Sequence, residues 1–145
     1  MISCDTNILF PAFDKDSPFH DRARTFLDSC SGRADFCLCE QVLMELYCLL
    51  RNPTVCRPPL SSGKAVDIIR GVRANPVWRI VDLMPGHGIM DRVWQHAAGH
   101  TFAYRRLFDV RLAMVLKHHG VSEFATRNGA DFRECGFTRL WDPLA

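Results

Sequence analysis

The chain has 145 residues, of which 48% are hydrophobic and 23% charged, the composition of an ordinary globular protein with one buried core. It contains no run of about 18 apolar residues that would predict a membrane span, and no secretory signal pattern. We therefore expect one cytoplasmic domain over residues 1–145, and the net charge of +2 is compatible with a polyanionic partner without requiring one.

Predicted strands alternate with predicted helices along the chain. Short apolar runs between turn residues indicate strands, and apolar residues spaced three or four apart indicate helices. In chain order we predict a strand at 1–4, a polar loop from 11 to 18, a helix at 20–30, a strand at 35–38, helices at 40–51 and 61–74, a strand at 77–83, helices at 88–101 and 108–119, a strand at 121–125, a polar loop or turn at 126–132 and a strand at 138–141. This alternation is typical of a parallel sheet covered by helices on both faces.

Several helix boundaries follow from local signals. Asn52 precedes Pro53 and so disfavours the helical backbone after residue 51. Ser61 or Ser62 is a suitable N-cap for the helix that follows. Gly120 stands in the usual closing position after the helix at 108–119.

The seven cysteines do not form a recognisable disulfide or zinc pattern. Their number is odd and their positions are scattered, which favours free thiols in a reducing cytosol. Cys37 and Cys39 are separated by one residue, where zinc knuckles have two. His96 and His100 have the spacing of a metalloprotease helix, but Ala97 stands where that motif needs a glutamate. We therefore do not expect a zinc site.

The first strand ends in Asp5-Thr6-Asn7. Parallel α/β sheets bind ligands in the crevice at the carboxyl ends of their strands, so this position is suited to a functional side chain. A carboxylate beside a sheet core is costly unless it is paired, hydrogen-bonded or bound to a metal. Asp5 is either one ligand of a metal site or the cap of the helix that follows.

Two further acids lie on apolar faces of predicted helices. Asp109 shares the i, i+3, i+4 and i+7 stripe of its helix with three apolar residues, Leu112, Ala113 and Leu116. Glu45 lies on a stripe with Val42, Cys48 and Leu49. Buried acids need compensation. Asp109 could instead be a first-turn acid stabilised by the helix dipole, and Glu45 could be partly exposed or paired with an arginine.

Taken together, Asp5, Glu45 and Asp109 favour a shared carboxylate site. Several carboxylates in one crevice repel each other unless a cation lies between them, and hard cations such as Mg²⁺ and Mn²⁺ prefer oxygen ligands. Such a site suits metal-assisted cleavage of phosphodiesters.

Four segments resemble the motifs of PIN-domain ribonucleases, in particular the VapC-type toxins of bacterial toxin–antitoxin pairs. In chain order they are Asp5-Thr6-Asn7, then Gln41-Val42-Leu43-Met44-Glu45-Leu46-Tyr47 with Arg51-Asn52-Pro53, then Phe108-Asp109-Val110-Arg111-Leu112-Ala113, then Ala125-Thr126-Arg127-Asn128-Gly129-Ala130-Asp131-Phe132. The resemblance covers nearly the whole chain. It implies a three-layer α/β/α sandwich with a central, mainly parallel sheet, and a Mg²⁺- or Mn²⁺-dependent endoribonuclease that cleaves RNA. It also implies a homodimer and a cognate antitoxin that holds the enzyme inactive.

Carried over residue by residue, the resemblance assigns the metal to Asp5, Glu45 and Asp109. The family often has an acid where this chain has Asn128, so Asp131 is a candidate for the fourth catalytic carboxylate, and Asn128 for a neutral oxygen ligand or a residue that positions water. Three further residues are expected to orient the acids through hydrogen bonds, namely Thr6, Asn7 and Thr126.

Four arginines lie near two of these acidic segments and are candidates for phosphate contacts with RNA: Arg105, Arg106, Arg111 and Arg127. The alternative for each is a solvated helix face. Exposed phenylalanine or tyrosine rings could stack with unpaired bases, but the sequence does not indicate which ones.

Two other functions remain open. Asp5 could be the nucleophile of an aspartate phosphatase, although Asn7 stands where a D-x-D motif has its second acid. The chain could also be a PIN-fold module that binds RNA with little or no catalysis, which the uncharged Asn128 favours.

Overall fold

Five short strands form the centre of the molecule, in the spatial order β3-β2-β1-β4-β5 and all parallel. The computed structural model describes residues 1–145. The strands are β1 (Ile2–Cys4), β2 (Cys37–Cys39), β3 (Arg79–Val81), β4 (Glu123–Ala125) and β5 (Arg139–Trp141). The β2–β3 and β1–β4–β5 ladders are joined by a single parallel bridge between Ile2 and Phe36. The mainly parallel sheet predicted from the alternation of elements is confirmed.

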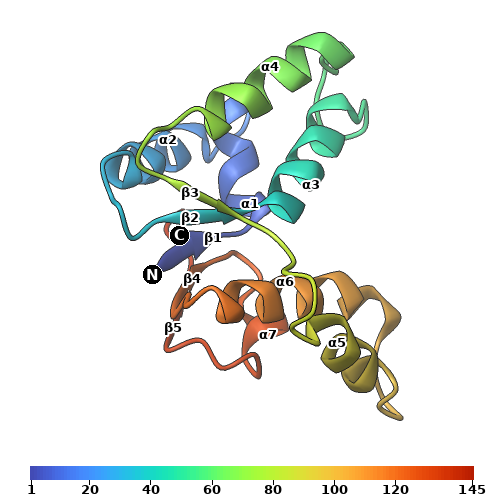
Figure 1. Cartoon of the computed structure of the whole chain (residues 1–145). Helices are drawn as coiled ribbons and strands as arrows, with labels where there is room; N and C mark the ends of the chain where they lie inside the picture. The colour runs from blue at the N-terminus through green and yellow to red at the C-terminus, as the bar shows by residue number, and fades with distance from the viewer.

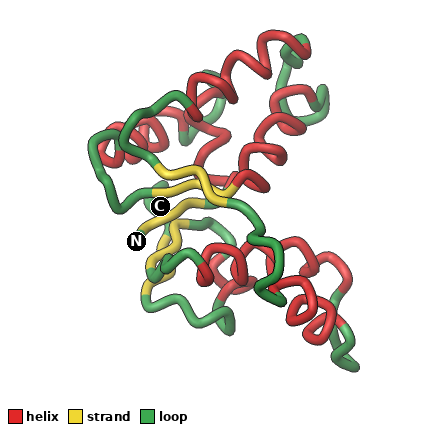
Figure 2. Tube along the Cα trace, in the orientation of Figure 1, coloured by secondary structure: helices red, strands yellow, loops and turns green.

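Helices cover both faces of this sheet. They are α1 (Thr6–Leu9), α2 (His20–Cys30), α3 (Glu40–Arg51), α4 (Ser62–Arg73), α5 (Ile89–Ala97), α6 (Leu107–His118) and α7 (Gly129–Phe132), with 3₁₀ turns η1 (Phe10–Phe13) and η2 (Tyr104–Arg106). Figure 1 shows α1 to α4 on one side of the strands and α5 to α7 on the other. The strands therefore lie between two helical layers, as Figure 2 also shows.

The burial of the strands follows from this layering. Every residue of β1 and β2 is buried, as expected for strands that are covered on both faces. Phe36, Leu38 and Phe124 are fully buried within one continuous apolar cluster. The buried strands thus form the centre of the molecule, and Asp5 directly follows the first of them.

The cysteines contribute mainly to this core. All seven are free thiols, and Cys4, Cys37 and Cys39 lie in the buried strands. Burial raises the pKa of both Cys37 and Cys39 to about 11, so these thiols are protonated at neutral pH. They act as small apolar residues. None of the helices is long and apolar enough to cross a membrane.

The structure differs from the sequence prediction at three places. The segment after Asp5 forms α1 and η1, because the Asp5 carboxylate caps the first turn and Pro11 suits the start of a 3₁₀ helix. The predicted loop at 126–132 contains the single turn α7. The helix predicted to end at residue 101 ends at Ala97, two residues before Gly99. For α1 and η1, short-range effects of Asp5 and Pro11 outweighed the broader pattern.

The packing of α3 predicts different costs for two neighbouring substitutions. Leu46 is fully buried, whereas 66% of Met44 is exposed on the same helix. Leu46→Ala should lower the free energy of unfolding by about 2–5 kcal/mol, because it leaves a cavity in the core. Met44→Ala should change it by about 0.5 kcal/mol or less. Urea unfolding checks both values, and equal losses for the two variants would contradict this packing.

Candidate active site

Asp5 lies at the point where the order of the strands in the sheet reverses. The chain winds outward from β1 through β2 to β3, and then returns to the other side of β1 with β4. The crevice at the carboxyl ends of β1 and β4 is therefore the switch point at which open α/β sheets bind ligands. Asp5 immediately follows β1, and its backbone N–H donates to the carbonyl of Ala125 at the end of β4 (2.9 Å).

Three hydrogen bonds hold the carboxylate of Asp5. It accepts from the backbone N–H of Thr6 (2.7 Å), from Nδ2 of Asn7 (2.8 Å) and from the hydroxyl of Thr126 (2.7 Å). Asp5 is only 9% exposed, and this burial raises its pKa even though the hydrogen bonds act in the opposite direction. The negative charge of Glu45 raises it further. Asp5 is thus both a helix cap and a buried carboxylate beside a second one.

Asn7 and Thr126 also connect the ends of β1 and β4 to each other. The Asn7 side chain donates to the Thr126 hydroxyl (3.3 Å) and accepts from the backbone N–H of Arg127 (3.1 Å). The hydroxyl of Thr126 is buried and in turn accepts from the backbone N–H of Asn128 (3.0 Å). These contacts fix the orientation of Asp5 from two strands at once.

Glu45 approaches the same crevice from α3. Its carboxylate accepts from the hydroxyl of Thr6 (2.8 Å) and from Nε2 of Gln41 (3.2 Å). The stripe on which the sequence places Glu45 is only partly buried, since Val42 is inside but Cys48 is exposed. The buried side of α3 instead follows the leucines at 43, 46 and 50, and Glu45 lies at its edge.

Gln41 is a site residue that the sequence analysis did not identify as functional. Besides Glu45, its Nε2 donates to the carbonyl of Phe108 (2.9 Å), and its Oε1 accepts from Arg111 (2.8 Å). Gln41 therefore connects α3 with the start of α6. A polar residue four positions before Glu45, on a helix that is otherwise largely buried, was the available signal.

Asp109 brings the third acid, from the first turn of α6. Leu112, Ala113 and Leu116 of its stripe are buried, as predicted. Asp109 is half-buried, and burial is the main reason that its pKa is raised to about 6. The negative charges of Asp5, Asp131 and Glu45 raise it further, and the positive charge of Arg106 opposes them. The structure therefore brings the three predicted acids, with Asp131, into electrostatic contact.

The two candidates for the fourth position lie in different surroundings. Asn128 is exposed, and its hydrogen bond to Thr126 comes from the backbone rather than from the side-chain amide. Asp131 is partly buried on α7, close enough to raise the pKa of Asp109. The geometry therefore favours Asp131 over Asn128 as the fourth charged group of the crevice.

The four predicted arginines are not equivalent. Arg106 donates to the backbone carbonyl of Asp131 (3.1 Å) and lies beside the acids. Arg111 binds Gln41 and lies 3.7 Å from Asp82. Arg127 packs over the ring of Phe19 and lies 3.7 Å from Asp142, and Arg105 is exposed against Tyr104. In this structure Arg111 and Arg127 are held by other residues of the chain, whereas Arg106 combines closeness to the acids with an unpaired donor atom, Nε.

The chemistry of this set of side chains fits a hard divalent cation. The crevice offers carboxylate oxygens from three separate elements, and besides burial the negative charges of the neighbouring acids raise the pKa of Asp109. No three acidic, histidine or cysteine side chains lie close enough together to hold a metal ion as they are placed. The oxygens of Glu45 are turned to Thr6 and Gln41.

The electrostatics of Asp109 predict a pH-dependent stability of the metal-free protein. Its folded pKa of about 6 lies above the ordinary value of 3.8, so the stability due to this group is complete below about pH 4 and is lost as the pH rises through 6. Because Asp109 is half exposed, solvent screening limits the effect to about 1 kcal/mol. Asp109→Asn should therefore be more stable than the wild type at pH 8 and equally stable at pH 4.

Denaturant unfolding at the two pH values measures this difference. Asp67→Asn is the matched control, since Asp67 is exposed on α4. A wild type that is more stable than Asp109→Asn at pH 8 would show that the acids do not repel each other.

Known proteins resemble this chain over nearly its whole length. The PIN domain family model matches residues 2–137. The chain is 51% identical over 144 residues to Ribonuclease VapC24 of Mycobacterium tuberculosis, covering 99% of this chain and 97% of that protein. It is 27% identical over 143 residues to Ribonuclease VapC48 of the same species, covering 97% and 96%.

Solved structures resemble the fold. The structure of M. tuberculosis VapC20, described as a sarcin–ricin loop cleaving toxin, superposes with a TM-score of 0.71 at 19% identity, covering 95% of this chain and 97% of that one. FitAcB from Neisseria gonorrhoeae superposes with a TM-score of 0.63 at 21% identity, covering 99% and 98%. The sequence matches, which extend over nearly the whole chain, show that it belongs to the PIN-domain family, among the VapC-type ribonucleases.

Proposed function

We propose that this chain is a Mg²⁺- or Mn²⁺-dependent endoribonuclease and the toxin of a toxin–antitoxin pair. The observation that carries the proposal is the gathering of Asp5, Glu45 and Asp109 at one crevice, with the pKa of Asp109 raised by burial and by its neighbours' charges. Perturbed acids in a crevice at a sheet switch point are typical of catalytic sites. The 51% identity to a VapC ribonuclease supports RNA as the substrate.

The roles of the residues follow from their contacts. Asp5, Glu45 and Asp109 would hold the cation, which supplies charge stabilisation and activation of water for phosphodiester hydrolysis. Thr126 and Asn7 fix the orientation of Asp5, and Thr6 fixes that of Glu45. Such outer contacts set the direction and basicity of ligand oxygens.

Two positions beside the acids would act on the substrate. Asp131 adds negative charge on the α7 side, where it can accept a proton or orient water. Arg106 adds positive charge next to Asp109 and is the arginine best placed for a phosphate of the bound RNA. A cytoplasmic location, a homodimer and inhibition by a cognate antitoxin belong to the same proposal.

The aspartate-phosphatase alternative lacks a second acid. Asn7 occupies the position two residues after Asp5, and its amide donates to Oδ2 of Asp5. No carboxylate is therefore present there to protonate a leaving group. The RNA-binding module remains the second candidate, because the side chain of Asn128 is exposed and adds no charge to the crevice.

The nuclease proposal predicts a loss of cleavage in Asp109→Asn. The purified variant should cleave single-stranded RNA with Mg²⁺ or Mn²⁺ at least about 100-fold more slowly than the wild type, because loss of an outer contact alone already costs about 10- to 100-fold. Chelation by EDTA should abolish wild-type cleavage, and added Mn²⁺ should restore it.

Asp67→Asn is again the control and should cleave at the wild-type rate, since Asp67 is exposed on another helix. Gel analysis of a labelled RNA measures all rates, and circular dichroism checks the fold. Wild-type protein that binds RNA without cutting it would favour the binding-module alternative.

The toxin proposal predicts that expression arrests bacterial growth. Induction of the wild-type chain without a partner should stop growth, and induction of Asp5→Asn should not, because the variant lacks a metal ligand. Immunoblotting confirms equal protein levels. Unimpaired growth with soluble wild-type protein would contradict the toxin role. The cleavage assay would then decide the nuclease proposal separately.

A further inference from the structure

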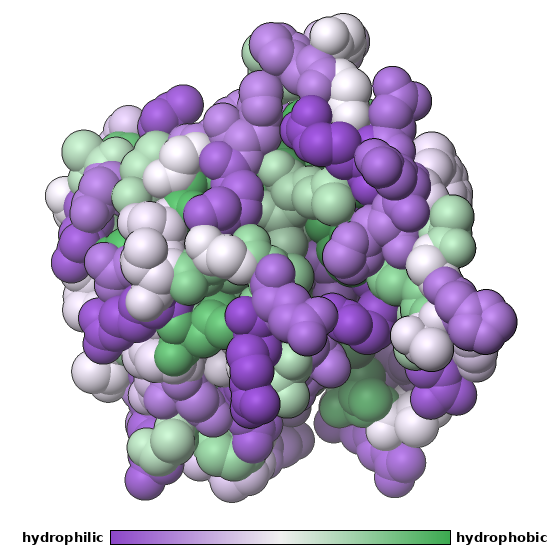
Figure 3. Space-filling model, turned by 90° about the horizontal axis from the view of Figure 1, so that it is seen from below, coloured by the Kyte–Doolittle hydropathy of each residue, from purple (hydrophilic) through white to green (hydrophobic).

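A second hollow lies beside the acids, on the outer side of α6. It has a volume of about 450 Å³, which is within the range of small-ligand sites. It is bounded by α5, by α6 and by residues 134–135, which follow α7. We call it the α6 hollow. Figure 3 shows the molecule from below, with apolar residues visible in hollows between hydrophilic ones.

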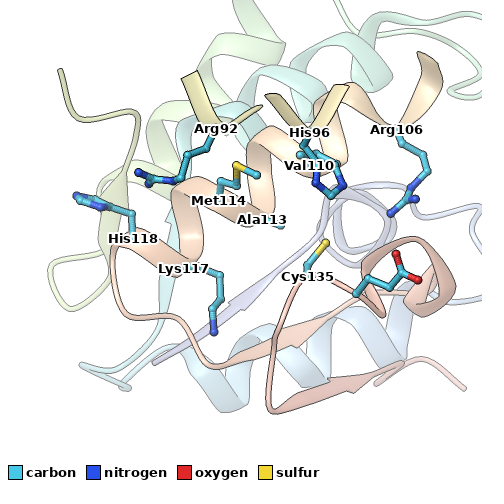
Figure 4. Close-up of a pocket in the computed structure, with 10 residues that line it drawn as sticks. Arg92, His96, Arg106, Val110, Ala113, Met114, Lys117, His118 and Cys135 are labelled. Atoms are coloured by element: carbon cyan, nitrogen blue, oxygen red, sulfur yellow. The ribbon is translucent and has the colours of Figure 1, made fainter. Parts of the chain in front are cut away.

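The floor of the α6 hollow is apolar for a simple geometric reason. Val110, Ala113 and Met114 follow one stripe of α6 at intervals of three and four residues. Figure 4 shows the side chains of Ala113 and Met114 between those of Arg92 and Cys135. Ala113 is small, so the stripe leaves space for a flat apolar group instead of filling it.

The rim of the α6 hollow is positively charged. Three cations line it, Arg92, Arg106 and Lys117, together with His96 and His118, whereas Glu134 is its single acid. None of the three cations forms a salt bridge within the chain. Arg92 and Lys117 donate to the backbone carbonyls of His87 and Gly136, which leaves their charge unneutralised.

Arg106 has a donor that the protein does not use. Its Nε is buried and has no hydrogen-bond partner, although Nη2 is bound to the carbonyl of Asp131. A buried donor of this kind is costly unless a ligand supplies an acceptor. The same side chain borders the α6 hollow and lies next to Asp109, so one arginine connects the hollow to the acidic crevice.

We propose that the α6 hollow binds one unpaired nucleotide of the RNA, next to the phosphate that is cleaved. The base would lie on Val110 and Met114, and its phosphate would bind Arg106 and Arg92. Arg106 lines the hollow and lies beside Asp109, so the hollow is a neighbour of the acidic crevice. An apolar floor with a cationic rim fits a base with its phosphate, and RNA is commonly read through such unstacked bases. This inference rests on the proposed function.

Binding of nucleoside monophosphates tests the α6 hollow directly. The probes are the four ribonucleoside 5′-monophosphates, with inorganic phosphate as a comparison, added to the full chain and followed by NMR. At least one nucleotide should shift both the methyl signal of Met114 and the ring signals of His96. In the variants the His96 ring signals alone are followed: Met114→Trp should abolish their shift by filling the hollow, and Met114→Leu should keep it. Nucleotides that shift neither signal would overturn the inference.

RNA cleavage and binding give the second test. Met114→Trp should lower kcat/KM for single-stranded RNA by about ten-fold, the loss expected for one stacked base, while Met114→Leu stays near the wild type. Arg92→Gln should reduce the slope of log RNA affinity against log salt concentration by about 0.7, because one phosphate contact is lost. Arg70→Gln is the control and should leave this slope unchanged, since Arg70 is exposed on α4.

The outcomes separate the two proposals. If the wild type cleaves RNA and Met114→Trp is equally active, the nucleotide site is overturned and the nuclease proposal stands. The hollow would then be assigned to a protein partner. Wild-type protein that cleaves no RNA overturns the proposed function, and the nucleotide titration then decides separately whether the hollow binds nucleotides. Thermal unfolding of Met114→Trp excludes misfolding as the cause of its loss.

Discussion

The hydrogen bond between Thr126 and Asp5 is the contact on which the crevice depends. It joins the ends of β1 and β4 across the switch point of the sheet, and it is buried. A buried carboxylate needs partners, and Asp5 obtains them from its own first turn and from a strand that is distant in sequence. The other acids are then added from helices on each face of the sheet, with Glu45 on α3 and Asp109 on α6.

Hydrogen bonds hold Glu45 near Asp5 in spite of the repulsion between the two carboxylates. Thr6 and Gln41 donate to Glu45, and Gln41 also connects α3 to the start of α6 through the carbonyl of Phe108. Burial, and after it the repulsion from the neighbouring acids, raises the pKa of Asp109. Keeping acids on largely apolar elements costs stability, as expected for functional residues that break the pattern of a buried helix face.

The sequence predicted the elements better than their contacts. Long periodic segments such as 20–30 and 40–51 form helices with the predicted limits, because apolar spacing determines which face packs on the sheet. The turn α7 and the bridging role of Gln41 were missed, since both depend on partners far away in the chain. The three acids could be identified because each is a charge on an apolar element. The arrangement of the arginines could not, because a surface arginine reveals its partner only in three dimensions.

The separation of Thr126 from Asp5 by 121 positions also bears on how the molecule is made. During synthesis the chain emerges from its N-terminus, and domains fold as units while this happens. A nascent chain that ends before residue 126 has Asp5 and Glu45 but lacks the hydroxyl that fixes Asp5. The crevice can therefore be completed only after most of the polypeptide has left the ribosome, and an unfinished chain would lack the assembled site.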